Sequence, residues 1–433
     1  MKLKMSEEKL IVQGIRPEEQ LWGAYQFPTP YKTDDGIVVS VHVTDDSISH
    51  FRQDAKRWFK SCDNGETWFE VDSSVSAQCG IKLRNGDRLF FPQVGSIDVS
   101  GYEFTHMHYM TPATDMTEPA PEGVFPLQDG LTFDMNGTVI MGYNAERLAP
   151  EFSKKQWLAY RLKSDSDELT EEYVSLDWPY LTRVVYINGD VKIMRPVFPH
   201  GRAKYAPDGS LWISTYSGDG HINPETGRYS PYYSAEILRS TDNGMSFKLH
   251  CHMEYPADGS KEYPYLSGGF SDNDFEFMSD GSVVWFLRSA WFARTGYEWA
   301  PMYMCRSTDL GKTWSKPQIF SDTGIYPSIC KLTDGTALIC YARPGIFVTA
   351  CENYSGTKWC EPLEVMTPGD RSHLANIVPD KIKFHDWDGA CNNPQLLALD
   401  DNTALIFYSD FYYPDSAGVK RKSILCRKIT VER

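Results

Sequence analysis

The nine residues RSTDLGKTW, at 306–314, form a pattern that recurs along this chain. A second copy, RSTDNGMSF, occupies 239–247, and a third, KSCDNGETW, occupies 60–68. All three fit Ser-x-Asp-x-Gly-x-Thr/Ser-aromatic, and we call these segments the boxes. In such a segment the Asp accepts hydrogen bonds from backbone amides, the Gly supplies a positive φ, and the aromatic ring packs against strands. Three copies in one chain predict a repeated β-hairpin. A fourth segment, ENYSGTKW at 352–359, keeps the Gly and the Trp and lacks the Asp.

A second repeat supports the first. At seven places along the chain, an apolar segment is followed by a short polar turn and then by a segment rich in β-forming residues. The turns are centred on Asp35-Gly36, Asn85-Gly86, Asn136-Gly137, Asp208-Gly209, Asp280-Gly281, Asp334-Gly335 and Asp401-Asn402. Asp-Gly and Asn-Gly are strong hairpin signals. Their spacing of roughly 50 to 70 residues suits the four-stranded blades of a β-propeller with loops of variable length.

The order of turns and boxes predicts the architecture. Each blade is expected to run as inner strand, turn, second strand, long loop, third strand, box and fourth strand. The box residues Trp68 and Trp314 are expected to be buried within their blades. We therefore predict an all-β fold with a single β-propeller domain over residues 1–433, with seven blades favoured and six as the alternative. Lys9 to Val12 is expected to pair with the last blade near Ser423 to Val431, which removes an exposed sheet edge. Turns and boxes should share one face, and the starts of inner strands and the ends of second strands should share the other.

The boxes resemble the Asp boxes, or BNR repeats, of the sialidase-like propeller superfamily. This resemblance covers most of the chain and implies a structural role for Asp63, Asp242 and Asp309. True sialidases carry Arg-Ile-Pro at the start of the first inner strand, and that Arg binds the substrate carboxylate. Here the matching residues are Gln26-Phe27-Pro28. Because Gln lacks the charged fork that binds a carboxylate, this departure argues against standard sialic-acid hydrolysis.

The other candidate residues come from the resemblance and from the face that is expected to lie opposite the turns and boxes. Arg288 and Arg343 resemble the remaining two arginines of the sialidase triad. The segment FPHGR at 198–202 offers a base near neutral pH and a cation, and loops rich in aromatic, His and Arg residues suit a functional face. Our candidates are His200, Tyr326 and His50 for catalysis, and Arg202, Arg288, Arg343, Gln26, Asp272, Asn392 and Arg147 for substrate binding.

Three functions fit these residues. Some seven-bladed propellers that resemble this superfamily are polysaccharide lyases, in which His or Tyr removes a proton beside a uronate carboxylate and Arg stabilises the negative charge. We therefore predict a carbohydrate-active enzyme that cleaves an acidic oligosaccharide containing uronate or sialate, with elimination favoured. The alternatives are an exo-sialidase or other glycoside hydrolase, and a non-catalytic glycan-binding propeller without convergent His, Tyr and Arg residues.

Composition limits the partners. The net charge of −15 and the pI of about 5.2 argue against nucleic acid and anionic membranes. No signal peptide and no apolar run of membrane-spanning length are recognised, so we expect a cytoplasmic location. Ten Cys without a CxxC pair predict buried thiols and not a zinc site. Asp272-Asn273-Asp274 offers calcium ligands, but capping of a strand or binding of sugar hydroxyls is the preferred interpretation. We expect no metal and no cofactor.

Overall fold

The computed structural model describes residues 1–14, 26–43, 56–91, 96–98, 124–125, 139–144, 156–166, 168–177, 181–187, 190–194, 203–217, 221–226, 229–230, 232–263, 267–291, 301–322, 324–342, 345–366 and 393–433. Their regular secondary structure is almost entirely β-strand, as predicted, with one short 3-10 helix, η1 (Ser73–Gln78), in the described part. Among them, no helix has the length and apolar character needed to cross a membrane. The chain groups into two compact units. Unit 1 comprises Met1–Gly80, Asp274–Arg288 and Ala293–Arg433, and unit 2 comprises Ile81–Asn273 and Ser289–Phe292.

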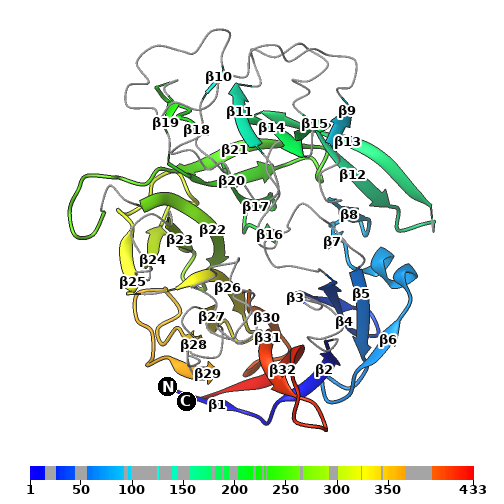
Figure 1. Ribbon diagram of the computed structural model, residues 1–433. Coiled ribbons are helices and arrows are strands. Elements are labelled where there is room, and N and C mark those ends of the chain that lie inside the picture. The colour runs from blue at the N-terminus through cyan, green and yellow to red at the C-terminus, as the bar shows by residue number, and fades with distance from the viewer. Residues whose placement is uncertain are drawn as a thin grey trace. The chain divides into compact units, whose positions relative to one another are not determined.

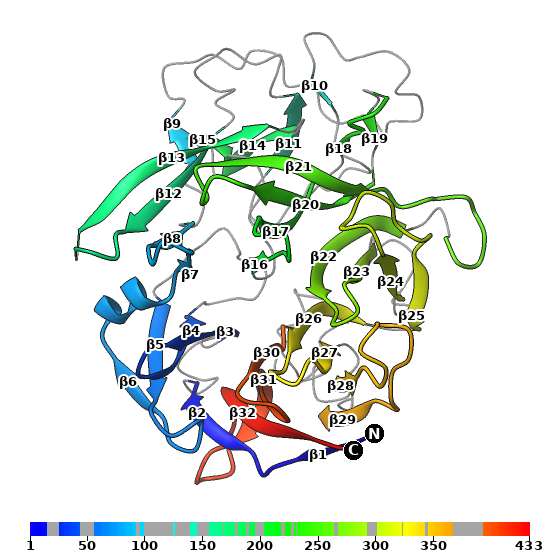
Figure 2. The ribbon, with the colours of Figure 1, turned by 180° about the vertical axis from the view of Figure 1, so that it is seen from behind.

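Three four-stranded sheets of unit 1 have their strands in chain order (Figures 1 and 2). The first sheet contains β3 (Gln26–Thr33), β4 (Gly36–His42), β5 (Lys56–Ser61) and β6 (Phe69–Val71). Another contains β26 (Ile325–Lys331), β27 (Ala337–Ala342), β28 (Ile346–Ala350) and β29 (Leu363–Met366). A third contains β22 (Ser267–Phe277), β23 (Val283–Trp291), β24 (Met302–Ser307) and β25 (Gln318–Ser321), and its first two strands continue into unit 2. Such four-stranded sheets fit the blades of a propeller.

The last sheet of unit 1 combines both ends of the described chain. β30 (Gln395–Ala398), β31 (Thr403–Pro414) and β32 (Lys420–Glu432) are joined by β1 (Lys2–Met5) and β2 (Lys9–Gln13). β1 pairs antiparallel to β32 from Lys2↔Glu432 to Met5↔Ile429, and β2 pairs from Lys9↔Cys426 to Gln13↔Ser423. The predicted pairing of the N-terminal segment with the last sheet is confirmed.

The sheets of unit 2 depart from simple chain order. β7 (Ile81–Lys82), β8 (Arg88–Phe90), β12 (Gln156–Leu162) and β13 (Leu169–Asp177) form one antiparallel set. β16 (Lys204–Tyr205), β17 (Leu211–Tyr216), β20 (Ala235–Ser240) and β21 (Ser246–Met253) form a second, and a short parallel pairing of β13 with β21 joins the two. A separate sheet has the order β10-β11-β14-β15-β9, from β9 (Ser96–Asp98), β10 (Val124–Phe125), β11 (Val139–Asn144), β14 (Leu181–Ile187) and β15 (Asp190–Met194). β18 (His221–Ile222) and β19 (Tyr229–Ser230) pair with each other.

Six of the seven predicted turns lie among the described residues, and each joins neighbouring strands. The turn at Asp334-Gly335 is typical. The Leu332 amide donates to the Thr336 carbonyl at 2.8 Å, and the Gly335 amide donates to the Leu332 carbonyl at 3.0 Å. Gly335 has φ +94°, and a Cβ there would lie 2.4 Å from Ser279 Oγ, so this position requires glycine. The turn at Asn136-Gly137 lies outside the described residues, and the number of blades stays a prediction.

Hydrogen bonds from side chains within each box hold its turn together. In the box at 306–314, Ser307 Oγ donates to Asp309 Oδ1 at 2.8 Å, and the Gly311 and Thr313 amides donate to Ser307 Oγ and Asp309 Oδ1 at 2.8 and 2.9 Å. The boxes at 60–68 and 239–247 repeat these bonds. Hydrogen bonds from the Thr313 hydroxyl and amide lower the pKa of the Asp309 carboxyl to about 2.

The fourth segment forms a box with different residues. Asn353 replaces the Asp, because its Oδ1 accepts from the Lys358 amide at 3.3 Å. Cys351 replaces the Ser, because its Sγ accepts from the Gly356 amide at 3.2 Å. The Trp359 indole donates to the Gly356 carbonyl at 3.0 Å, as Trp314 does to Gly311 at 3.1 Å. A neutral amide and a thiol therefore maintain the same turn.

Turns and boxes lie at the same end of each sheet, as predicted. The box serines pair with residues at the starts of the second strands, next to the turns: Ile37↔Ser61, Leu211↔Ser240 and Val283↔Ser307. The cation before each box serine forms an ion pair with the acid of the adjacent turn. These pairs are Lys60–Asp35, Arg239–Asp208 and Arg306–Asp280. Functional candidates at the starts of inner strands therefore lie at the opposite ends of these sheets.

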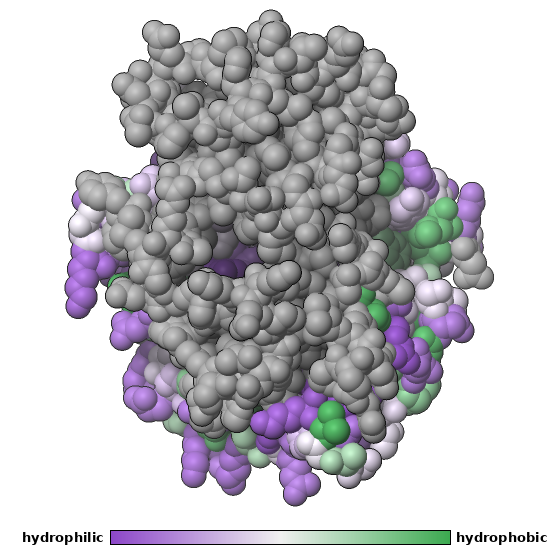
Figure 3. Space-filling model, in the orientation of Figure 1, coloured by the Kyte–Doolittle hydropathy of each residue, from purple (hydrophilic) through white to green (hydrophobic). Residues whose placement is uncertain are grey.

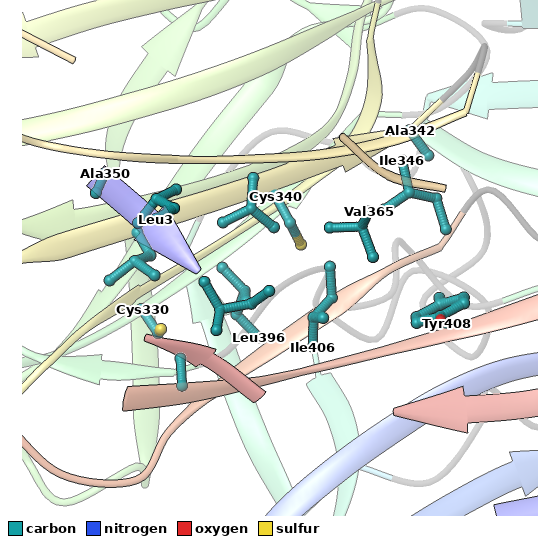
Figure 4. Close-up of a cluster of buried hydrophobic side chains, with 14 of the residues drawn as sticks. Leu3, Cys330, Cys340, Ala342, Ile346, Ala350, Val365, Leu396, Ile406 and Tyr408 are labelled. Atoms are coloured by element: carbon teal, nitrogen blue, oxygen red, sulfur yellow. The ribbon is translucent and has the colours of Figure 1, made fainter. Parts of the chain in front are cut away.

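The core of unit 1 lies between its sheets. Figure 4 shows one cluster, in which Cys340 and Ile346 of the β26–β29 sheet lie near Leu396 and Ile406 of the β30–β32 sheet. Every one of these four side chains is fully buried. In Figure 3, the described residues that reach the surface are mainly hydrophilic, with scattered hydrophobic ones. Burial of apolar area is thus concentrated between sheets.

One expectation about the boxes is wrong. We predicted that Trp68 and Trp314 are buried within blades, but both are half-buried. The indole of Trp68 donates to the Gly65 carbonyl at 3.2 Å, so the ring folds back over its own turn and stays near the end of the sheet. The fully buried tryptophans among the described residues are Trp212 and Trp285, which belong to second strands.

The box geometry predicts a purely structural effect for Asp309→Ala. The substitution removes the acceptor of two Thr313 donors and of the Ser307 hydroxyl, so the turn loses its internal bonds. We expect a lower thermal midpoint with unchanged turnover per folded molecule. Calorimetry together with an activity assay checks this. Intact stability with abolished turnover would show that the box belongs to the active site.

Candidate functional site

The structure describes four of the ten predicted site residues. Tyr326, Arg288 and Gln26 lie in unit 1, and Asp272 lies in unit 2. Of Gln26 only the backbone is described. The other six, His200, His50, Arg202, Arg343, Asn392 and Arg147, lie outside the described residues, and their roles stay predictions.

Tyr326 has an unusual backbone conformation. It lies at the start of β26, where the register with β27 shifts between Ile325 and Ser328. Its φ is +52°, and Pro327 follows. For a residue with a side chain, such a conformation costs about 1–3 kcal/mol and persists only where the surroundings impose it. A bulge of this kind re-aims a side chain, and the Tyr326 ring is half-buried against the core cluster of Figure 4.

Phe27 shows the same geometry in the first sheet. Its φ is also +52°, Pro28 follows, and the register shifts between Gln26 and Thr29. The Phe27 ring meets the His42 ring edge-on, with centroids 5.6 Å apart. The shared backbone shape is thus a property of inner strands that start with aromatic-Pro. What distinguishes Tyr326 is its hydroxyl.

Arg288 lies near the end of a second strand, away from the turn. It is half-buried and is the last residue of β23 that pairs with β24, opposite Met302. In the first sheet the equivalent residue is His42, which pairs with Lys56 at the end of β4. His42 was not among the predicted site residues, because it lies within an expected strand and not in a loop. The available signal was its distance from the turn. His42 lies six residues after Gly36, and Arg288 lies seven residues after Gly281. Unit 1 therefore places a phenol, a guanidinium and an imidazole at the ends of strands away from the turns.

The Asp272-Asn273-Asp274 segment is mainly structural. Asn273 Nδ2 donates to the carbonyls of Thr215 and Ser271 at 2.8 and 2.9 Å. Asp274 Oδ2 accepts from the Ile329 amide at 2.9 Å, and Asp274 Oδ1 accepts from the Phe275 amide. Within the described ranges, no three acidic, His or Cys side chains form a group that would hold a metal. Asp272 is buried at 6 % exposure, and its role in binding sugar stays a prediction.

Unit 2 contains a buried charged cluster that sequence reasoning missed. His252 of β21 lies across from Glu236 of β20, with Nδ1 3.5 Å from Glu236 Oε1 and Nε2 3.8 Å from Glu254 Oε1. Ser234 Oγ also donates to Glu236 Oε1 at 3.3 Å. Burial opposes the charged imidazole, but the two carboxylates outweigh that effect and raise the pKa of His252 to about 9.

This cluster predicts a dependence of stability on pH. A His whose folded pKa exceeds its unfolded value near 6.5 contributes its full stabilisation below pH 6.5 and loses it as the pH rises through about 9. Urea unfolding of the wild type should therefore show lower stability at pH 9 than at neutral pH. His252→Gln should remove most of this slope. Equal slopes for the two proteins would contradict the assignment.

Comparisons with known proteins place the fold. No family model matches the chain, and no curated protein matches it. Among solved structures, a protein of unknown function from Dyadobacter fermentans shares 14 % identity over 99 % of both chains, with a TM-score of 0.50. The NanB sialidase of Streptococcus pneumoniae shares 13 % identity over 98 % of this chain and 70 % of its own, with a TM-score of 0.46. An α-L-arabinanase of Penicillium chrysogenum, complexed with arabinobiose, shares 12 % identity over 98 % of each chain, with a TM-score of 0.47. The first likeness indicates a shared fold.

Proposed function

We propose that this protein is a carbohydrate-active enzyme that cleaves glycosidic bonds in an acidic oligosaccharide. The observation that carries the proposal is the placement of Tyr326. Its phenol is set by a strained backbone at the start of an inner strand, away from the turns and boxes. Arg288 and His42 lie at the corresponding ends of second strands in the same unit. This set supplies a proton-transfer group and a partner for a carboxylate.

Elimination is the favoured reaction. A base, Tyr326 or His200, removes the proton from the carbon beside the uronate carboxylate, and the electron pair forms a carbon–carbon double bond as the glycosidic oxygen leaves. Arg288, with Arg343 of the same unit, binds the carboxylate and stabilises the negative charge that develops on it. The departing oxygen receives a proton, so the products are one saturated and one unsaturated sugar chain.

Hydrolysis is the second candidate, because Tyr is also the nucleophile that the sialidase resemblance implies. The two reactions differ in their products. Oligogalacturonate and sialyllactose should be incubated with the protein, and both new reducing ends and the ultraviolet absorbance of a conjugated carboxylate should be followed. Elimination yields a conjugated uronate that absorbs, whereas hydrolysis yields reducing ends alone. If the protein binds these sugars and cleaves none of a wider acidic panel, the glycan-binding alternative replaces the enzyme.

A further inference from the structure

A buried carboxyl group of one sheet in unit 1 bonds the backbone of the inner strand that carries Tyr326. Asp274 lies on β22 and is 2 % exposed. Its Oδ2 atom accepts a hydrogen bond from the Ile329 amide of β26 at 2.9 Å, and its Oδ1 atom accepts from the Phe275 amide at 2.9 Å. Burial of a carboxyl group is unfavourable unless donors reach its oxygens, and here each oxygen has a backbone donor.

The bonded amide directly follows the bulge that sets Tyr326. Between Ile325 and Ser328, β26 advances three residues while β27 advances two, and Tyr326, with φ +52°, lies in the extra length. Such a conformation persists only where its surroundings impose it. The bond between Asp274 and the Ile329 amide fixes the strand immediately after the bulge, so it limits how the bulge can relax.

The same stretch of β26 is held from its other side. Ser328 Oγ accepts a hydrogen bond from the Leu396 amide of β30 at 3.1 Å, and Ser328 is buried. In both bonds a side chain of one inner strand binds an amide of the next inner strand along the chain. The segment that follows Tyr326 is therefore fixed between β22 and β30, through Asp274 on one side and Ser328 on the other.

The first sheet forms the same bulge where such a bond is impossible. Phe27-Pro28 has a φ of +52° at Phe27 beside an equivalent register shift, and the residue that corresponds to Ile329 is Pro30. Proline has no N–H, so no carboxyl group can bind the strand at that point. Formation of the bulge thus does not require a bond like that of Asp274. What the bond adds is a fixed position of the bulge relative to the neighbouring sheet.

We propose that Asp274 is a positioning residue for Tyr326. It fixes β26 against the β22–β25 sheet, which carries Arg288, and so sets the place of the phenol relative to the guanidinium. This rests on the proposed function, in which Tyr326 transfers a proton and Arg288 binds the substrate carboxylate. Loss of the bond would leave both groups present but misplaced, and a small misplacement of reacting groups lowers the rate of the chemical step.

The kinetic test compares three variants on the best acidic substrate. Asp274→Ala should lower kcat about 10- to 100-fold with a smaller change in KM. Asp274→Asn keeps the size of the side chain and one carbonyl acceptor, so it should recover part of the lost rate. Lys331→Met is the matched control and should leave kcat unchanged. Lys331 Nζ donates to the Phe277 carbonyl at 2.6 Å, which joins the same two sheets nearer their turns.

A double variant decides whether Asp274 acts through Tyr326. In the Tyr326→Phe protein the proton-transfer group is already absent, so adding Asp274→Ala should change kcat less than about twofold. Losses that multiply in the double variant would overturn the positioning role, because Asp274 would then act independently of the phenol.

A spectroscopic measurement tests the position of Tyr326 without any substrate. In protein with ¹³C-labelled tyrosine rings, the NMR signal of Tyr326 is identified by its absence from Tyr326→Phe. Asp274→Ala should shift or broaden this signal, and Lys331→Met should leave it in place. Circular dichroism shows whether each variant folds, and if Asp274→Ala does not, Asp274→Asn provides the same comparison.

The outcomes separate this proposal from the proposed function. A Tyr326 signal that changes in the Asp274 variants, with no acidic oligosaccharide cleaved by the wild type, supports the positioning role and removes the enzymatic function. A signal that stays in place, with acidic oligosaccharides cleaved at the wild-type rate by Asp274→Ala, overturns the positioning role and leaves the function intact.

Discussion

Tyr326→Phe is expected to reduce the rate of glycosidic cleavage by about 10²–10⁴-fold, the usual effect of removing a proton-transfer group. The substitution deletes one hydroxyl and keeps the ring that packs on the core cluster. The chain itself shows that Phe tolerates this backbone, because Phe27-Pro28 adopts the same φ of +52° beside an equivalent register shift. Steady-state kinetics with the best acidic substrate measures the effect.

The control is Asp309→Ala, which changes a box in the neighbouring β22–β25 sheet of the chain, at the end of that sheet where the turns lie. The thermal midpoint of Tyr326→Phe should stay close to that of the wild type, so that lost activity cannot be attributed to unfolding. A Tyr326→Phe protein with unchanged kcat would remove Tyr326 from the chemistry. In that case the proton-transfer role would pass to His200, His50 or His42.

Trp285→Ala is expected to lower the free energy of unfolding by about 3–5 kcal/mol. The Trp285 side chain is fully buried in β23, and its ring lies 5.1 Å from that of Trp314. Removing it leaves a cavity that the surrounding strands cannot fill. Urea titration followed by circular dichroism measures the change.

Trp314→Ala is the natural comparison. Trp314 occupies the box and is only half-buried, so less apolar surface is lost on substitution. We expect a clearly smaller effect than for Trp285→Ala. If Trp314→Ala were the more damaging of the two, the box indole and not the buried second-strand indole would be the main packing element of this sheet.

The sequence predicted the repeated parts of the fold because their causes are local. A turn such as Asp334-Gly335 needs a glycine at positive φ, and a box such as 306–314 needs an Asp with nearby donors. Both can therefore be recognised from a few consecutive residues. The pairing of β2 with β32 was also predictable, because an apolar N-terminal segment and an apolar C-terminal strand each need a partner. The fourth segment was recognised by its Gly and Trp, but the roles of Cys351 and Asn353 were not, because these residues replace Ser and Asp in hydrogen bonding and not in residue type.

Long-range features were harder to predict. β9, β10 and β11 lie between β8 and β12 in the chain, yet they belong to a different sheet, and no local signal marks this interruption. The burial of a Trp depends on its place in the sheet: Trp314 lies in a box and is half-buried, whereas Trp285 lies in a second strand and is fully buried. The candidate site combines ends of strands far apart in sequence. Tyr326 was chosen from the phase of the turns and Arg288 from the resemblance to the sialidase triad, whereas His42 required the observed register. Their roles stay predictions.

The most direct measurement is a comparison of four proteins on one acidic oligosaccharide: wild type, Tyr326→Phe, Arg288→Lys and Asp309→Ala. New reducing ends are quantified per folded molecule. The wild type and Asp309→Ala should cleave at similar rates, Tyr326→Phe should lose about 10²-fold or more, and Arg288→Lys should use the substrate less well because Lys lacks the fork that binds a carboxylate. Full activity in both Tyr326→Phe and Arg288→Lys, with activity lost only in Asp309→Ala, would contradict a site at the ends of strands away from the boxes.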